Sequence, residues 1–498
     1  MRQTTLPILF LFILVNSSYS QSFDKRYDLG ELSSLWSIVN PDSIYLASGV
    51  YAYYDSIGNE IDVPLVVATS KLGDTLWTHK FFGASFSVSR KMIQTRDSNF
   101  VLTAFWQMLD SSGGGNHYYD SDIFLAKFDR YGNILWQTIY SHPNDTSLGP
   151  YSLCETENGN LVVSGYQFQW SGIIDLAFLY VFDSNGNYLN HSSFPNPPDN
   201  INTSVLYFNR RFYLSGTDYF LNTGADPILL CTDTNFQQIW MDSLVSAGRD
   251  FGAGLDSTLD GNLLWSTYFS NYTGPVPHLA VRMIKVDTAG SIIWTYNSNV
   301  IFSSNGAVYC RPTIDSGYVW AGGLNNVLQA GSSNNGYLVK LDAQGDSIWG
   351  MIFDHGSIDN FFDVRQTSDS GYVMCGESYG SIGGNYKSLG WIVKVDRWGC
   401  LVSGCNPLGI QEQEENKLLD VYPNPFQDYV TIMYKQQPHH AQQKAVLKIY
   451  DLPGREIFKA DLLDNKSMIN LSFLTKGSYI AVLFTENKKF VRKLIKSH

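Results

Sequence analysis

Runs of apolar residues that have the character of short strands follow one another along most of the chain, and turn-forming residues separate them. Residues 65–70 (LVVATS) and 228–232 (ILLCT) are typical runs, while the intervening stretches are rich in Gly, Asn, Asp and Ser. β-branched and aromatic residues favour strands, and small polar residues favour tight turns. The apolar positions show no helical period here, so the pattern predicts an all-β structure.

The same pattern recurs at a nearly constant interval. Six stretches share a strand, a turn and a second strand that ends at a common marker position, and a seventh, WIVKVDRWGCLVS, closes the series. The markers are Trp77, Trp136, Asn190, Trp240, Trp294, Trp349 and Ser403, at spacings of 59, 54, 50, 54, 55 and 54 residues. The unit that ends at Asn190 is degenerate because it lacks the tryptophan. Such regularity indicates an internal repeat.

Each unit contains two tight turns. In one, an Asp ends a strand and a Gly follows three residues later, as at Asp129 and Gly132, where the turn favours a residue that tolerates a positive φ. The other is a hairpin turn such as DSGYV at 315–319. Four short strands per unit, repeated around an axis, are typical of a β-propeller.

We therefore predict an all-β fold: a seven-bladed β-propeller over residues 21–405, followed by a linker at 406–416 and a small Ig-like β-sandwich at 417–498. The number of blades could instead be six or eight if the degenerate units at either end of the series are wrongly assigned. The marker tryptophans are interpreted as blade packing. The repeats resemble those of secreted propellers with a D-x-x-G-x-x-x-W turn and also quinoprotein and kelch-type blades, a likeness specific for architecture and not for activity.

The first twenty residues predict a cleavable signal peptide. Arg2 gives a positive start, residues 6–15 are apolar, and Ser18 and Ser20 are small residues before a cleavage site at Gln21. The apolar run is too short to span a bilayer, and no other segment is long enough, so no transmembrane segment is expected after cleavage.

The net charge of −12 is unevenly distributed. Residues 413–498 carry 13 Lys and Arg against 9 Asp and Glu, so the rest of the chain carries all of the acidic excess. Binding to nucleic acid needs clusters of Lys and Arg, and the acidic main domain therefore argues against a nucleic-acid partner.

Six cysteines are present, and four lie singly in apolar runs where they are expected to be buried: Cys154, Cys231, Cys310 and Cys375. Cys400 and Cys405 are close together at the end of the repeats, and an oxidising compartment permits a disulfide between them. No histidine lies nearby, so we predict neither a metal site nor a cofactor.

Connections of variable length are expected on one face of the propeller, because alternate connections of a meander emerge at the same end. Loops that vary on a repeated scaffold commonly carry binding residues. This face is rich in aromatic residues, which suit a glycan or a protein partner. The predicted ligand-binding residues are Tyr118, Tyr119, Trp170, Tyr219, Tyr272, Tyr379 and Tyr386.

No catalytic constellation stands out in the sequence. Arg311 and Arg365 recur at one register, each four residues before a D-S-G turn, as converging arginines of a sialidase-like site would, but equal register favours a structural role. The histidines show no metal-like pairing. We therefore expect no enzyme and name no catalytic residue.

The C-terminal segment carries a series of distinctive motifs: VYPNPF at 421–426, the LKIYDLPGREI hairpin, LTKGSYIAVL and a basic end, FVRKLIKS. Together they resemble a type A sorting domain of the type IX secretion system of Bacteroidota. The resemblance implies recognition by the outer-membrane translocon, followed by release or surface attachment. It assigns sorting-motif roles to Pro423, Asn424, Pro425, Gly477, Tyr479, Lys493 and Lys496.

The sequence thus predicts a propeller that is exported through the periplasm and is secreted or held on the outer cell surface. The first functional hypothesis is a binding module for a glycan or a protein. The alternatives are a secreted propeller enzyme, either a glycoside hydrolase or a lyase, and a structural component of a surface layer.

Overall fold

The chain forms two compact units, residues 1–406 and 407–498. The computed structural model describes residues 22–108, 121–143, 146–169, 175–194, 200–220, 224–245, 250–271, 278–298, 309–325, 334–356, 358–382, 385–402, 419–422, 426–434, 445–450, 455–462, 466–484 and 489–496. Within these ranges, no helix has the length and apolar character needed to cross a membrane. The predicted signal peptide lies outside them.

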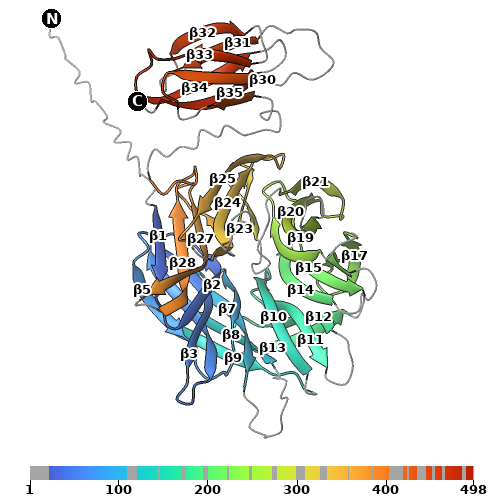
Figure 1. The fold of residues 1–498 in the computed structure, drawn as a ribbon. Coiled ribbons are helices and arrows are strands. Elements are labelled where there is room, and N and C mark those ends of the chain that lie inside the picture. Colours follow the sequence, from blue (N-terminus) through green and yellow to red (C-terminus); the bar gives the residue numbers. More distant parts are fainter. Residues whose placement is uncertain are drawn as a thin grey trace, which may run out of the picture. The chain divides into compact units, whose positions relative to one another are not determined.

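The first unit is a β-propeller of seven four-stranded antiparallel sheets (Figure 1), as predicted. Blades 1 to 3 comprise β2 (Leu32–Val39), β3 (Ile44–Tyr54), β4 (Glu60–Ser70), β5 (Thr75–Lys80); β6 (Ser89–Gln94), β7 (Phe100–Gln107), β8 (Ser121–Phe128), β9 (Ile134–Tyr140); β10 (Thr146–Glu155), β11 (Leu161–Gln169), β12 (Asp175–Phe182) and β13 (Tyr188–Phe194). Blades 4 and 5 comprise β14 (Asn200–Phe208), β15 (Arg211–Phe220), β16 (Gly224–Thr232), β17 (Gln238–Ser243); β18 (Phe251–Ser257), β19 (Leu263–Asn271), β20 (His278–Val286) and β21 (Ile292–Asn297). Blades 6 and 7 comprise β22 (Cys310–Pro312), β23 (Tyr318–Asn325), β24 (Asn334–Leu341), β25 (Ser347–Phe353); β26 (Asp359–Gln366), β27 (Tyr372–Ile382), β28 (Asn385–Val395) and β1 (Phe23–Tyr27).

Blade 7 is completed by the N-terminal strand, which closes the ring. β1 pairs antiparallel with β28, with Phe23 opposite Lys394, and Figure 1 shows β1 (blue) alongside β28 (orange). In blade 2 the residue opposite the corresponding Lys127 is the marker Trp136. Phe23 therefore occupies the seventh marker position, and the assignment of that position to Ser403 was wrong. The error arose because the fourth strand of this blade comes from the opposite end of the sequence.

The marker side chains join neighbouring blades. Trp77 of blade 1 donates a hydrogen bond from Nε1 to the carbonyl of Arg130, in the D-x-x-G turn of blade 2, at 3.2 Å. Its ring also lies against Gly132, where an added Cβ would be 3.0 Å from the indole. The same contact recurs around the ring in the pairs Phe23–Gly73, Trp136–Gly186, Trp240–Gly290, Trp294–Gly345 and Trp349–Gly399. The tryptophans are thus packing residues between blades, as predicted.

A buried lysine stabilises the second turn in four blades. Its ammonium group forms an ion pair with the Asp of the turn in the same blade, in the pairs Lys127–Asp97, Lys285–Asp260, Lys340–Asp315 and Lys394–Asp369. Each lysine lies on the third strand of its blade, and all four are directly opposite a marker tryptophan or Phe23.

The first strand of each blade is the innermost, because these strands contact one another from blade to blade. In six blades the register of this strand shifts at a bulge, which inserts an extra residue at Trp36, Arg90 and Tyr151 in blades 1 to 3. The residue after the bulge connects neighbouring blades by a hydrogen bond. Ser152 accepts a hydrogen bond from the Val205 amide, and Ser204 accepts one from the Leu255 amide.

The second unit contains a three-stranded and a four-stranded sheet. The first consists of β29 (Leu419–Tyr422), β30 (Tyr429–Tyr434) and β33 (Lys466–Asn470), and the second of β32 (Glu456–Leu462), β31 (Ala445–Tyr450), β34 (Gly477–Phe484) and β35 (Lys489–Lys496). One apolar core that includes Ile432, Leu447 and Leu483 joins the two sheets. This is the small β-sandwich that the strand pattern predicted.

The cysteines follow the sequence expectation in part. Cys231, Cys310 and Cys375 are buried and free, and Cys154 is free and half-buried. Cys400 is disulfide-bonded. Cys405, its predicted partner, lies outside the described residues, so that pairing stays a prediction.

Candidate binding pocket between blades 3 and 4

The packing rule of the propeller fails at the boundary between blades 3 and 4. The marker position of blade 3 is Asn190, which is exposed and too small to reach the next blade. The facing turn of blade 4 has Phe236 where the other turns have glycine, and Phe236 adopts a left-handed backbone with φ of 63°. The Phe236 ring packs beside Phe212, with ring centroids 5.3 Å apart, and covers part of the space that a tryptophan fills elsewhere.

The lysine–aspartate pair is missing at the same place. The position of the buried lysine in blade 3 is Val181, which is paired with the marker Asn190. The turn that would supply the aspartate has Asn158 instead, and its Oδ1 accepts a hydrogen bond from Thr156 at 2.6 Å. Two large groups are therefore absent from this boundary: the aromatic marker ring present in every other blade, and the lysine side chain present in four of them.

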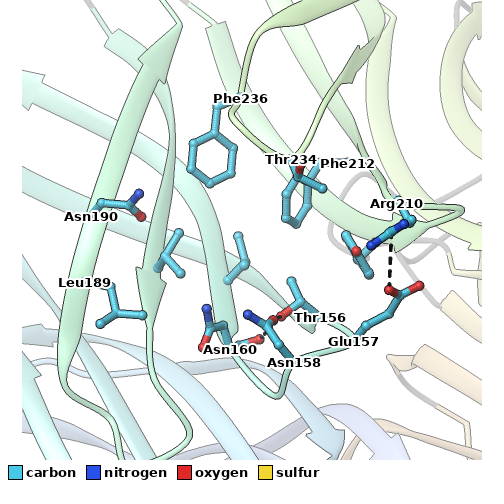
Figure 2. Close-up of a pocket in the computed structure, with 13 residues that line it drawn as sticks. Thr156, Glu157, Asn158, Asn160, Leu189, Asn190, Arg210, Phe212, Thr234 and Phe236 are labelled. Carbon is cyan, nitrogen blue, oxygen red and sulfur yellow. Dashed lines mark hydrogen bonds and ion pairs between the residues drawn. The ribbon is translucent and has the colours of Figure 1, made fainter.

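A pocket of about 620 Å³ occupies this boundary. Figure 2 shows its side chains arranged around a common hollow. It is lined by Thr156, Glu157, Asn158, Asn160, Val162, Val181, Leu189, Asn190, Tyr207, Arg210, Phe212, Thr234 and Phe236. The four residues that depart from the repeat at this boundary, Asn158, Val181, Asn190 and Phe236, are among them. The loss of the repeat residues thus accounts for the pocket.

The pocket combines an apolar floor with a polar, nearly neutral rim. Val162, Val181 and Phe212 are buried and form the floor. The rim carries amides and a hydroxyl group from Asn158, Asn190 and Thr234, all of them exposed.

The charged groups of the rim neutralise each other. Arg210 Nε lies 3.6 Å from Glu157 Oε2 in an exposed ion pair, drawn as a dashed line in Figure 2. Burial, with a further contribution from Glu157, raises the pKa of Tyr207, so its phenol stays protonated at neutral pH and remains a donor. Uncharged donors and acceptors above an apolar floor match the hydroxyl groups and apolar faces of a sugar ring.

The residues that the sequence analysis selected for binding lie elsewhere. Tyr118, Tyr119, Trp170 and Tyr272 lie outside the described residues, and Tyr219 is placed in β15 without a described side chain. Two come together in blade 7: the Tyr379 and Tyr386 rings lie 5.9 Å apart, and Tyr386 is 60% exposed. Binding by this set stays a prediction.

The inter-blade pocket was missed, although a signal for it was present in the sequence. The unit that ends at Asn190 was recognised as degenerate, but the degeneracy was not interpreted as a cavity. Arg311 and Arg365 do converge, as a sialidase-like site would require, and yet Arg311 forms ion pairs with Asp256 and Asp363 while Arg365 donates to the Ile38 carbonyl. These contacts agree with the structural role predicted for them.

The sorting-motif residues have mixed positions. Pro423, Asn424 and Pro425 lie outside the described residues, and so does the Lys493 side chain. Gly477 begins β34, and Tyr479 is buried, with its hydroxyl group donating to the Thr475 carbonyl at 2.6 Å. Lys496 is only 3% exposed; it donates to the Gln427 carbonyl and lies 3.3 Å from Asp428. Lys496 therefore anchors the last strand, and its role in sorting stays a prediction.

Structural comparison finds solved structures that resemble the chain at low sequence identity. An α-L-arabinanase from Penicillium chrysogenum, complexed with arabinobiose, shares 11% identity at a TM-score of 0.39, over 62% of this chain and 93% of that one. An α-L-arabinofuranosidase from Clostridium thermocellum shares 11% at 0.33, over 53% and 94%. Prolyl oligopeptidase B from Galerina marginata shares 10% at 0.36, over 68% and 46%.

These comparisons contradict the expectation that the protein is not an enzyme, because the similar structures include an arabinanase and an arabinofuranosidase. At such low identity the likeness concerns the fold and identifies no substrate. No curated protein matches the chain.

The C-terminal unit gives a definite match. Residues 420–497 match the family described as the secretion system C-terminal sorting domain, in agreement with the motifs of that segment. Such a domain directs export by the type IX secretion system, to the cell surface or the medium. The chain is therefore an exported β-propeller protein that carries a secretion system C-terminal sorting domain.

Proposed function

We propose that the exported propeller binds a neutral glycan in the pocket between blades 3 and 4. The observation that carries this proposal is the exchange of four repeat residues for Asn158, Val181, Asn190 and Phe236, which together line one hollow of about 620 Å³. A hollow of this size accommodates a few sugar units. Its rim offers uncharged hydrogen-bonding groups, and its one ion pair is internally neutral.

Restoring the repeat provides the sharpest test. The double variant Asn190→Trp, Phe236→Gly recreates the packing of the other blades and fills the hollow. We expect it to fold with unchanged or higher stability, because it adds an inter-blade tryptophan contact and removes a left-handed phenylalanine. On a glycan array, the full-length mature protein should bind neutral glycans, and this variant should lose that binding.

Two further variants serve as controls. Asn158→Ala removes a rim amide and should weaken binding about 10-fold, the usual effect of losing a hydrogen bond in a pocket. Asn185→Ala changes an exposed asparagine outside the pocket and should leave binding unchanged. The same samples should be assayed for release of sugar fragments, which separates binding alone from hydrolysis.

The alternative that the aromatic residues of the variable loops bind the glycan is tested in the same assay with Tyr386→Ala. If Tyr386→Ala abolishes glycan binding and the double variant does not, the site lies on blade 7 and the pocket proposal is wrong. A wild-type protein that binds no glycan on the array would equally overturn it, and would favour a protein ligand or a structural role.

A further inference from the structure

A second group of functional side chains lies where the innermost strands meet at the propeller axis. Lys91 of blade 2 reaches the far side of the ring, where its Nζ lies 4.0 Å from the centre of the Tyr309 ring of blade 6. Arg311 bridges two blades, with Nη1 3.0 Å from Asp256 and Nη2 2.8 Å from Asp363. These contacts form a charged cluster on the axis.

The axis has an excess of positive charge within a strongly acidic protein. Among the described residues it holds four cationic side chains, Arg90, Lys91, Arg311 and Arg365, and two carboxylates, Asp256 and Asp363. Arg311 is paired with both carboxylates, and Arg365 lies 3.9 Å from Asp363. Burial and the nearby Arg311 lower the pKa of Lys91 to about 7. The cluster is thus deficient in negative charge.

Arg90 is the cation for which no counterion is described. Its guanidinium lies over the Trp36 ring at 4.3 Å and near the rings of Tyr151 and Phe105, at 5.1 and 5.3 Å. Nε is buried without a hydrogen-bond partner, and no carboxylate of the described ranges lies within ion-pair distance. The side chain as a whole remains partly exposed, as do Trp36 and Tyr151.

The bulge of β6 accounts for this position. It inserts Arg90 between Ser89 and Lys91, so Arg90 and Lys91 both project from the innermost strand into the axial cluster. Contact with aromatic rings offsets only part of the cost of removing a guanidinium from water. A buried or half-buried arginine normally acquires a carboxylate or a comparable anion, and its planar fork of donors fits a carboxylate best.

We propose that Arg90 is the anchor of an axial anion site that binds the carboxylate of an acidic sugar. The carboxylate pairs with the Arg90 guanidinium, and the partly exposed Tyr151 contacts the sugar ring. Trp36 supports the guanidinium from below, because its ring stacks on Phe362 at 4.9 Å and lies under Arg90 at 4.3 Å. The three arginines of the cluster outnumber its two carboxylates, and this net positive charge favours an anion at this position. This site differs in charge and location from the neutral pocket of blades 3 and 4, and it does not depend on that pocket.

The test uses the full-length mature protein and isothermal titration calorimetry. Galacturonate should bind, and galactose at equal ionic strength should not, because only the former has the carboxylate. Arg90→Gln should reduce the affinity for galacturonate by about 10- to 100-fold, the loss expected for a charge-assisted pair. Arg90→Lys should show an intermediate affinity, because it keeps the charge and loses the fork. Titration with an oligogalacturonide in the same experiment shows whether the site binds a free acidic sugar or the end of an acidic sugar chain.

Two controls separate this site from the pocket. Arg210→Gln removes an exposed arginine of the pocket, and the double variant Asn190→Trp, Phe236→Gly fills the pocket; neither should change galacturonate binding. Equal binding of galacturonate by wild type and Arg90→Gln would overturn the proposal, as would no binding by wild type. Binding of sulfate as tight as galacturonate would overturn the sugar assignment.

A stability measurement guards against a misfolded variant. If Arg90 has no counterion until a ligand binds, the melting temperature of Arg90→Gln without sugar should be no lower than that of wild type, because the variant removes an uncompensated charge. A large drop in melting temperature for both Arg90→Gln and Arg90→Lys would show instead that Arg90 is needed for folding, and would overturn the proposal.

Discussion

Single residues at the tight turns decide how closely neighbouring blades approach. The glycines of the D-x-x-G turns have a positive φ, such as 89° at Gly345, and they also face the marker ring of the preceding blade. The serines of the second turn adopt the left-handed region as well, with φ of 64° at Ser316 and Ser370. Glycine is therefore favoured in the first turn for two reasons, its conformation and its contact with the ring, and the serines of the second turn show that a positive φ alone does not exclude a larger residue.

A matched pair of substitutions separates the two reasons. Gly345→Ala would place a Cβ 2.9 Å from the Trp294 ring, whereas Gly58→Ala has the same kind of φ, 88°, with nothing within 4 Å. We expect Gly58→Ala to cost about 1 kcal/mol in the free energy of unfolding, for the backbone alone. Gly345→Ala should cost about 2–4 kcal/mol, because overpacking is added. Urea denaturation measures both, and equal losses would show that the ring contact has no energetic weight.

At the scale of elements, the N-terminal strand β1 closes the ring of blades by completing blade 7. Asp24 of β1 accepts a hydrogen bond from Trp391 Nε1 at 2.7 Å, and its other oxygen lies 3.4 Å from His355 Nε2. The opposite ring nitrogen of His355 lies 3.6 Å from Asp359 of β26. A histidine between two carboxylates thus connects the outermost and innermost strands of blade 7 to the preceding loop.

This histidine makes the closure dependent on pH. The adjacent carboxylates of Asp24 and Asp359 raise the pKa of His355 to about 9, against 6.5 in the unfolded chain. The folded state therefore binds the proton more tightly, so the stabilisation is complete below pH 6.5 and is lost as the pH rises through 9. We expect about 1–2 kcal/mol, since the group is partly exposed. Wild type should lose this amount between pH 6 and 10 relative to His355→Gln; parallel curves for the two proteins would disprove the link.

Removal of the closing strand should open the propeller. Deletion of residues 22–27 leaves the edge of β28 unpaired and takes away Phe23, the marker that packs against Gly73 of blade 1. An unpaired edge promotes association between chains. We expect the deletion variant to lose its sharp thermal transition and to aggregate in size-exclusion chromatography.

A peptide rescue controls this experiment. A synthetic peptide of residues 21–29 should restore the sharp transition by pairing with β28, since strand addition at a free edge is driven by backbone hydrogen bonds. A deletion variant that melts like wild type without peptide would show that the closure contributes little.

At the scale of the whole molecule, the propeller and the sorting domain are two units with separate apolar cores. The C-terminal unit has its own apolar core, with Leu447 and Leu483 fully buried. Truncation after Asn406 should therefore leave the melting temperature of the propeller unchanged, while the protein should be retained in the periplasm. Fractionation of cells that express either the full-length or the truncated protein shows where each form accumulates. Secretion of the truncated form would show that the sorting domain is dispensable.

The sequence determined the repeat, the all-β class and the sorting tail, because strand period, turn residues and motif order are local features that need no partner to be read. It also marked the weak unit at Asn190. Only the tertiary structure decided the rest. The closing strand lies more than 350 residues from the strand it pairs with, so spacing assigned the seventh marker to Ser403 in place of Phe23. The pocket and the axial cluster arise from side chains of different blades, and a cavity exists only once neighbouring sheets have packed and left a volume unfilled.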